Sequence, residues 1–366
     1  MAVEESSSII GASNDAEGAT PTSAKLEPPK TIYFHPKGDV KLLIGPDDGM
    51  EDSGITHIYI VSSAVMSLVC EPWNALMDPD NRFAESRSGE FKLLGDDPVA
   101  LRILLQIAHL QFEKVPYALI TEQLLQLAIL TDKYQAIKLL IPFLRRWANR
   151  LVHDIDEPLS AGCERWLWIA WAFGFEGVFG RMASMLTFEC TTNLRGDTLL
   201  YDGKELSEPV PCEILDTILK IREETVEKVM EAVGNVTDEM FTKSLAYSNC
   251  KAPSERKQAC DTLTVGSLLA GLNRLGLRER LSPLKYTGSI GDMVKNFLKI
   301  EFHKLNTSEH PNCGLLPEFK KSINAVIEAM PSAVSEHHKT HIKEQQKILK
   351  IPLSYEYRAR WKLEGL

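Results

Sequence analysis

Alternating apolar and polar positions mark strands in the first third of the chain. Val40, Leu42 and Ile44 recur at every second position before a Gly-Pro-Asp-Asp turn. Another run, THIYIV, is rich in β-branched and aromatic residues, and GEFKLL is a third short run. Such runs, bounded by turn residues, are typical of strands. The sequence therefore predicts three strands, at residues 38–45, 56–61 and 89–94.

Between and after these strands, apolar residues recur at the spacing of helices. Two short helices are predicted at residues 62–70 and 71–77. An acidic residue followed by Pro98 predicts a helix start near Asp97. Further helical periods cover residues 98–108, 121–134 and 137–147. Pro142 should kink the last of these helices or shift its start.

After an Asp-Glu-Pro break at residues 156–158 the pattern predicts only helices. Trp166, Trp168 and Trp171 lie within six residues, which indicates a buried helix pair, with a partner groove as the second interpretation. A long bundle helix is predicted to end at Gly234. The other predicted helices are residues 263–276, 288–305 and 315–330, and a solvated terminal helix from Ser335 to Lys350.

Composition limits the class of protein. The chain has 366 residues, of which 44% are hydrophobic and 25% charged, as expected for two globular domains with disordered ends. Residues 1–30 contain few large apolar side chains and are predicted to be a disordered tail. The net charge of -9 repels polyanions, so we expect no nucleic acid partner, although the last 28 residues are locally basic.

The cysteines and the N-terminus favour an intracellular protein. The seven cysteines are an odd number without dense spacing, which indicates reduced thiols instead of a disulfide framework. The acidic, polar N-terminus does not have the pattern of a signal peptide, and no apolar run is long enough to span a bilayer. We therefore expect no membrane association. Nothing in the sequence distinguishes cytoplasm from nucleus.

Four phrases of the sequence resemble a known protein family. They are GDVKLLIG, IYIVSSAVMSLVCEPWNALM, FKLLGDDPVALRILLQIAHLQFEKVP and LLQLAILTDKYQAIKLLIPFLRRW. In this order and spacing they resemble the BTB/POZ domain of filamentous-fungal proteins, except that Val61 stands where many members have His. The resemblance implies an α+β fold, in which a small three-stranded sheet is capped by helices and followed by an all-α domain. The expected division is a tail at 1–30, the BTB/POZ domain at 36–152, the helical domain at 157–332, and a terminal helix and tail at 333–366.

The resemblance implies a protein-binding module without catalytic residues. BTB domains self-associate or bind other proteins, and one branch connects substrates to cullin-type ubiquitin ligases. We therefore expect an adaptor or scaffold, with a self-associating scaffold or transcriptional co-regulator as the alternative. The domain-swapped dimer of many BTB proteins is not favoured, because it uses an ordered N-terminal segment. The sequence contains none of the common nucleotide-binding, zinc-protease or serine-hydrolase motifs, so a cryptic enzyme is the least favoured class.

A short motif is the candidate contact for a partner. Cullin-binding members of the family carry an apolar residue, any residue and then Glu after the second short helix. Phe83 and Glu85 fit that pattern here. The resemblance implies that Phe83 fills a pocket while the Glu85 carboxylate fixes the register. The alternative is a Phe that packs under a surface loop beside a solvated Glu.

Cysteine and histidine residues in the last third form a candidate zinc site. Cys250 and Cys260 are followed by an H-x-x-C pair, His310 and Cys313. Two thiols and this pair have the ligand types of a tetrahedral structural zinc site. The alternative is a set of ordinary buried or reduced thiols. His303 is a spare candidate ligand, predicted to lie on the preceding helix.

Overall fold

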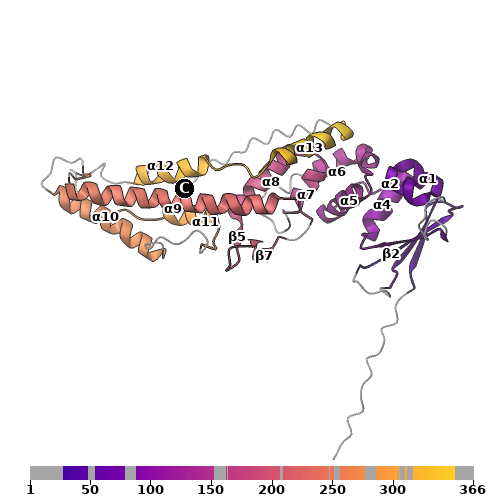
Figure 1. The fold of residues 1–366 in the computed structure, drawn as a ribbon, viewed down its shortest axis with the longest axis horizontal. Coiled ribbons are helices and arrows are strands. Elements are labelled where there is room, and N and C mark those ends of the chain that lie inside the picture. The colour runs from indigo at the N-terminus through magenta and orange to yellow at the C-terminus, as the bar shows by residue number, and fades with distance from the viewer. Residues whose placement is uncertain are drawn as a thin grey trace, which may run out of the picture.

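The computed structural model shows an α+β protein, with a small sheet at one end of an elongated helical body (Figure 1). Its elements pack around two hydrophobic cores, which follow one another along this body. The described residues are 28–47, 54–78, 88–151, 162, 164–206, 209–246, 248–250, 256–276, 286–303, 305, 310 and 316–350.

The first sheet contains the three strands that the sequence predicts. β2 (Val40–Gly45) pairs antiparallel with β3 (His57–Val61) and parallel with β4 (Glu90–Leu94). The apolar side chains that alternate in β2 are buried, while Lys41 between them is exposed. Alternation places one face of a strand against the core, and for β2 the predicted face is the buried one.

A fourth strand was not expected. β1 (Lys30–Tyr33) pairs in parallel with β3, which gives the strand order β1-β3-β2-β4. The expectation of three strands is therefore wrong, and the sheet begins ahead of the predicted domain start at residue 36. β1 is a short edge strand in which only Ile32 is even partly buried. It has no apolar face that a sequence pattern could show, and its partner lies far along the chain.

The helices around this sheet begin and end close to the predicted positions. The Asp97 carboxylate caps α4 by accepting a hydrogen bond of 2.7 Å from the N–H of Ala100. A 3-10 turn, η2, precedes α6, so that Pro142 lies in the first turn of α6, where its missing N–H is tolerated. The predicted shift of the helix start is confirmed. The helices are α1 (Ser63–Val69), α2 (Glu71–Met77), α4 (Pro98–Ala108), α5 (Thr121–Lys133) and α6 (Ile141–Leu151), with η2 at Ile137–Leu140.

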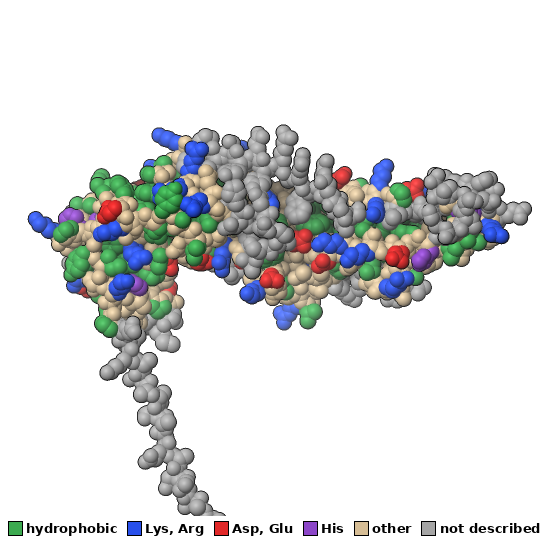
Figure 2. All heavy atoms as spheres, turned by 180° about the vertical axis from the view of Figure 1, so that it is seen from behind, with side chains coloured by type: hydrophobic (Ala, Val, Ile, Leu, Met, Phe, Trp, Pro, Cys, Tyr) green, Lys and Arg blue, Asp and Glu red, His purple; other side chains and the backbone are tan. Residues whose placement is uncertain are grey.

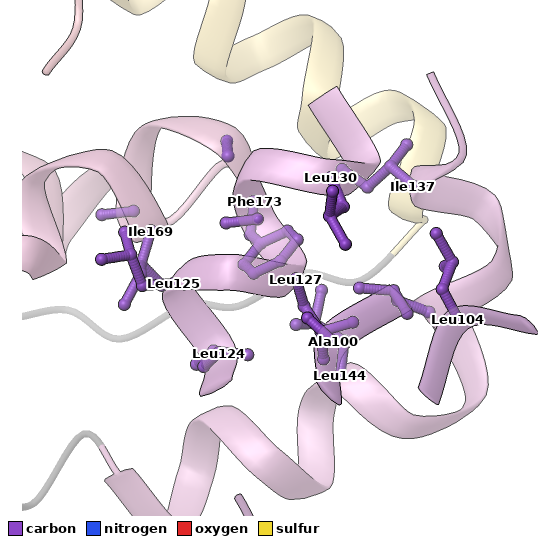
Figure 3. Packing of buried hydrophobic residues seen from close by; sticks show 14 of the residues in the cluster. Ala100, Leu104, Leu124, Leu125, Leu127, Leu130, Ile137, Leu144, Ile169 and Phe173 are labelled. Atoms are coloured by element: carbon purple, nitrogen blue, oxygen red, sulfur yellow. The ribbon is translucent and has the colours of Figure 1, made fainter. Parts of the chain in front are cut away.

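One hydrophobic core extends from the sheet through the tryptophan-rich helices. Figure 3 shows Leu127 of α5 and Leu144 of α6 in the same packed cluster as Phe173. Phe173 directly follows α7 (Arg165–Ala172), and α8 (Glu176–Glu189) comes next. This core continues to Ile221 in the following long helix, α9 (Ile214–Ala246). The packing therefore does not divide at the predicted break near residues 152–157.

A second core surrounds the distal part of a long helix. α9 runs from Ile214 to Ala246, past Gly234, so the predicted stop at this glycine is wrong. A glycine inside a helix costs about 1 kcal/mol, and burial of Val229, Val233 and Met240 on either side of it offsets that cost. The helices packed around this part are α10 (Lys257–Arg274), α11 (Ile290–Leu298) and α12 (Leu316–Glu328). Among the described helices, none combines the length and the apolar composition that a membrane span requires.

A small second sheet corrects the expectation of an all-α second domain. β5 (Thr191–Thr192), β6 (Leu199–Tyr201) and β7 (Lys204–Glu205) form an antiparallel sheet. The turn between β6 and β7 contains Asp202 and Gly203, both with positive φ. An Asp-Gly pair between two short runs is a strong hairpin signal. These strands contain only two or three residues each, too few to show an alternation of apolar and polar positions between the helices on either side.

The terminal helix is docked on the body, contrary to the expectation of a solvated helix. α13 (Glu336–Leu349) begins after the predicted cap Ser335 and packs against α7 and η2. The ring of His341 stacks on Trp171 at 3.7 Å between centroids. Ile342 is fully buried in the first core, and the side-chain amide of Gln346 donates to the carbonyl of Gly174 at 2.9 Å. The last described helix therefore returns to the first core.

Candidate functional sites

Exposed aromatic side chains gather in the connection between α4 and α5. Phe112 is 52% exposed and Tyr117 is 67% exposed. The ring of Phe112 lies 6.1 Å from that of Phe143 on α6. The guanidinium of Arg146 lies 4.5 Å from the centre of the Tyr117 ring, and that of Arg150 lies 5.3 Å from it. We call these five residues the aromatic–arginine surface.

Hydrogen bonds to the backbone hold this surface in place. The indole N–H of Trp147 and the guanidinium of Arg146 both donate to the carbonyl of Pro116, at 3.0 and 3.3 Å. The side-chain amide of Gln111 donates to the carbonyl of Phe34 at 2.8 Å, which ties the connection to the end of β1. The exposed rings are therefore presented by an anchored segment.

The surface is positively charged within an acidic protein. α6 carries three arginines, Arg145, Arg146 and Arg150, and no Asp or Glu, while Glu113 and Lys114 of the connection balance each other, although the chain as a whole carries a net charge of -9. Figure 2 shows hydrophobic side chains interspersed with Lys and Arg at the end of the molecule formed by the first sheet and its helices. An acidic group of a partner would be attracted to this region.

The predicted partner motif and the tryptophans have different outcomes. Phe83 and Glu85 lie outside the described residues, so the motif stays a prediction. Trp166 is buried in the first core. Trp168 and Trp171 pack against this core, and the centres of their two rings lie 4.9 Å apart. The interpretation as a core residue is confirmed for Trp166, whereas Trp168 and Trp171 are half-buried at the edge of the core, where the ring of His341 stacks on Trp171.

The structure brings three of the four predicted metal ligands together. The ligand atoms of Cys250, Cys260 and His310 all lie within 4.8 Å of one another. Cys250 Sγ lies 3.3 Å from His310 Nδ1. The three residues are buried, with exposed fractions of 6%, 1% and 1%. We call them the Cys-Cys-His cluster, and its donor atoms can hold a metal ion.

Of the remaining candidates, Cys313 and the spare ligand His303, the structure describes only His303, which does not join the cluster. Cys313 lies outside the described residues, so its role stays a prediction. His303 lies beyond the end of α11, not on a helix as expected, and is exposed. Its backbone is nevertheless fixed to α10, because its N–H donates to Ser267 Oγ at 3.1 Å.

Local hydrogen bonds position the cluster. Asn249 connects two helices, since its backbone N–H donates to the Asp261 carboxylate of α10 at 3.0 Å and its side chain donates to the carbonyl of Met240 of α9 at 3.1 Å. Cys250 is thereby held beside the first turn of α10, which contains Cys260. The sequence indicated the ligand types, whereas only the fold brings His310, 60 residues from Cys250, to the thiols.

Another cysteine–histidine contact was not predicted from the sequence. Cys212 Sγ lies 3.7 Å from His337 Nε2, and both residues are exposed. A thiol beside an imidazole is the first requirement for cysteine nucleophilic catalysis. The neighbouring His338 is fully buried, and its Nε2 lies 2.9 Å from the carbonyl of Cys212. These contacts connect α13 to the segment ahead of α9, which gives them a structural role.

Comparison of the chain with models of known protein families, with curated protein sequences and with solved structures finds no match in any of the three.

Proposed function

We propose that this protein is a non-enzymatic adaptor that binds other proteins, and that residues 36–152 form its BTB-type interaction module. The observation that carries the proposal is the aromatic–arginine surface. The order of strands and helices over this range supports the family resemblance, since β2, β3, α1, α2, β4 and α4 follow one another as the four sequence phrases imply.

Exposed aromatic and arginine side chains suit a protein interface. Tyr and Arg are among the residues that contribute most to binding energy in such interfaces. Tyr117 is held by two arginines and its segment is anchored at Pro116, so little side-chain freedom is lost on binding. The positive charge favours a partner with acidic groups around an apolar contact.

Two variants of the full chain test this proposal. The double substitution Phe112→Ala and Tyr117→Ala removes the two most exposed rings of the surface and leaves its backbone anchors in place. The matched control is Leu194→Ala, which removes an apolar side chain that is 94% exposed in the connection between β5 and β6. We expect the double variant to reduce capture of partners at least about tenfold, because hot-spot residues contribute 2 kcal/mol or more each. Equal capture by the double variant and by wild type would refute the proposal.

A cullin is the partner class that the family resemblance suggests. A pull-down with the full chain, followed by immunoblotting for cullins, tests it. Loss of cullin capture with Phe83→Ala or Glu85→Ala would favour a substrate adaptor of a ubiquitin ligase. Capture of other proteins without a cullin would favour the self-associating scaffold or transcriptional co-regulator.

Self-association is a separate part of the proposal. β1 pairs with β3 of its own chain. On the composition of residues 1–30, we propose that the chain does not form a domain-swapped dimer through its N-terminal segment. Light scattering of the full chain should give the mass of a monomer, 41.0 kDa. A concentration-independent dimer would contradict this part and leave the adaptor proposal intact.

Within this proposal, a metal at the Cys-Cys-His cluster is structural. Its three donor residues are buried, which suits an ion that holds segments of the chain together. Catalytic zinc sites keep an open position that a substrate or water can reach. The full-chain adaptor would therefore need the metal for folding and not for chemistry.

A further inference from the structure

We propose that Cys250, Cys260 and His310 bind one Zn²⁺ ion, which fastens the end of α9, the start of α10 and the segment after α11 to one another. The site lies in the part of the chain that packs around the second core, and it does not depend on the adaptor function proposed above.

The positions of the ligand atoms suit a tetrahedral ion. Zinc binds sulfur at about 2.3 Å and nitrogen at about 2.0–2.1 Å. Tetrahedral angles then place two sulfurs about 3.8 Å apart and a sulfur and a nitrogen about 3.6 Å apart. The structure has 3.3 Å between Cys250 Sγ and His310 Nδ1, and all ligand atoms lie within 4.8 Å of one another. To bind a zinc ion, the three ligand atoms would have to move by only about 1 Å or less.

The charges also balance. Two cysteine thiolates and a neutral imidazole carry together the charge of -2 that neutralises Zn²⁺. Buried charges are tolerated when they are paired or bind a metal. Cys260 lies in the first turn of α10, where the helix dipole favours a thiolate. Thiolate and imidazole donors together select zinc over magnesium or calcium, which prefer oxygen ligands.

Among the described residues, few apolar side chains pack beside the cluster. Cys250 and Cys260 form a small cluster with the partly buried Leu305, apart from the second core. Metal binding energy becomes folding energy in such a place, because the ion joins segments that the unfolded chain keeps apart. The anchors of Asn249 on Met240 and Asp261 hold one side of this junction. The hydrogen bond from the N–H of His303 to Ser267 fixes the backbone after α11 to α10.

The metal content of the purified full chain is the first test. Protein prepared without chelators or affinity metals should contain about one zinc per chain. Cys250→Ser and Cys260→Ser should each lower the zinc content or the zinc affinity at least about tenfold, because each removes a direct ligand. The matched control is Cys190→Ser, which changes a buried cysteine of the first core and should leave the zinc content unchanged.

Two measurements on the wild-type chain protect the test against variants that fail to fold. Titration with Co²⁺ should produce the absorption of a tetrahedral ion with thiolate ligands, and Zn²⁺ should abolish it. A chelator should lower the melting temperature, and added Zn²⁺ should restore it. A chain that takes up neither Zn²⁺ nor Co²⁺ overturns the proposal, because Cys250 and His310 are then only a hydrogen-bonded pair. Equal zinc binding by wild type and both cysteine variants also overturns it, since the ion would then lie elsewhere.

Discussion

Alanine in place of Gly174 tests whether α13 lies as close to α7 as the structure shows. Gly174 follows the end of α7 with a φ of +71°, in the left-handed region. A Cβ atom built there would lie 3.1 Å from the carbonyl oxygen of Ile342 and 3.1 Å from the backbone nitrogen of Gln346. These are backbone atoms of α13, so they cannot move aside as a flexible side chain would. Gly174→Ala must therefore strain the turn or displace the helix.

A second glycine supplies a control for the backbone conformation alone. Gly276 follows the end of α10 with a φ of +66°, and a Cβ there meets no described atom within 4 Å. Alanine in the left-handed region costs about 1–2 kcal/mol at either position. Displacement of α13 would add part of the packing of Ile342, whose complete loss costs about 2–5 kcal/mol. We expect Gly174→Ala to lower the free energy of unfolding by about 2–4 kcal/mol and Gly276→Ala by about 1–2 kcal/mol.

Urea denaturation followed by circular dichroism measures both losses. Tryptophan emission provides a local probe, because Trp171 stacks on His341 of α13. The emission of native Gly174→Ala should differ from wild type, whereas that of Gly276→Ala should not. Equal stability losses with unchanged tryptophan emission would refute the close packing of α13 on Gly174.

Three further predictions concern the pH, a helix cap and the fourth metal ligand. Burial lowers the pKa of His341 below its usual 6.5, and Asp132 partly offsets this effect. The unfolded chain therefore binds the proton more readily than the folded chain, so stability should decrease as the pH falls from about 7.5 through 6.5 to below the folded pKa. Melting temperatures of wild type and His341→Phe should show a smaller decrease for the variant, and equal decreases would contradict this cause. Asp97→Ala removes the cap of α4 and should cost about 1 kcal/mol in urea denaturation, whereas no loss would mean that the hydrogen bond is not formed in solution. If Cys313 is a ligand as the sequence predicts, Cys313→Ser should reduce the thiolate-to-Co²⁺ absorption by about one third, and unchanged absorption would exclude it.

Local signals were sufficient for most elements of the first part of the chain. Alternation marks β2, and the Asp-Pro pair at residues 97 and 98 marks the start of α4. Pro142 shifts the start of α6 as expected. These signals act through the backbone of neighbouring residues, so a reading of the sequence can find them. The same holds for the ligand types of the Cys-Cys-His cluster, which sequence spacing already suggested.

Elements that depend on distant partners were missed. β1 pairs with β3, whose residues lie beyond β2 in the sequence, and only one of its side chains is even partly buried. Gly234 ends a helix by local preference, but packing on both sides of it continues α9 to Ala246. The aromatic–arginine surface combines a connection at residues 112–117 with one face of α6. Nothing in either segment alone indicates the other.

The sequence by itself therefore determined where most helices and three strands of the first sheet form, because the alternation of apolar residues, caps and prolines acts within a few residues. The tertiary structure alone decided where α13 docks, because the same amphipathic pattern suits a solvated helix or one packed on Trp171. It also decided which of the predicted ligands meet. Cys250, Cys260 and His310 converge because the fold brings α9, α10 and the segment after α11 to one point, over distances in sequence that no local pattern encodes.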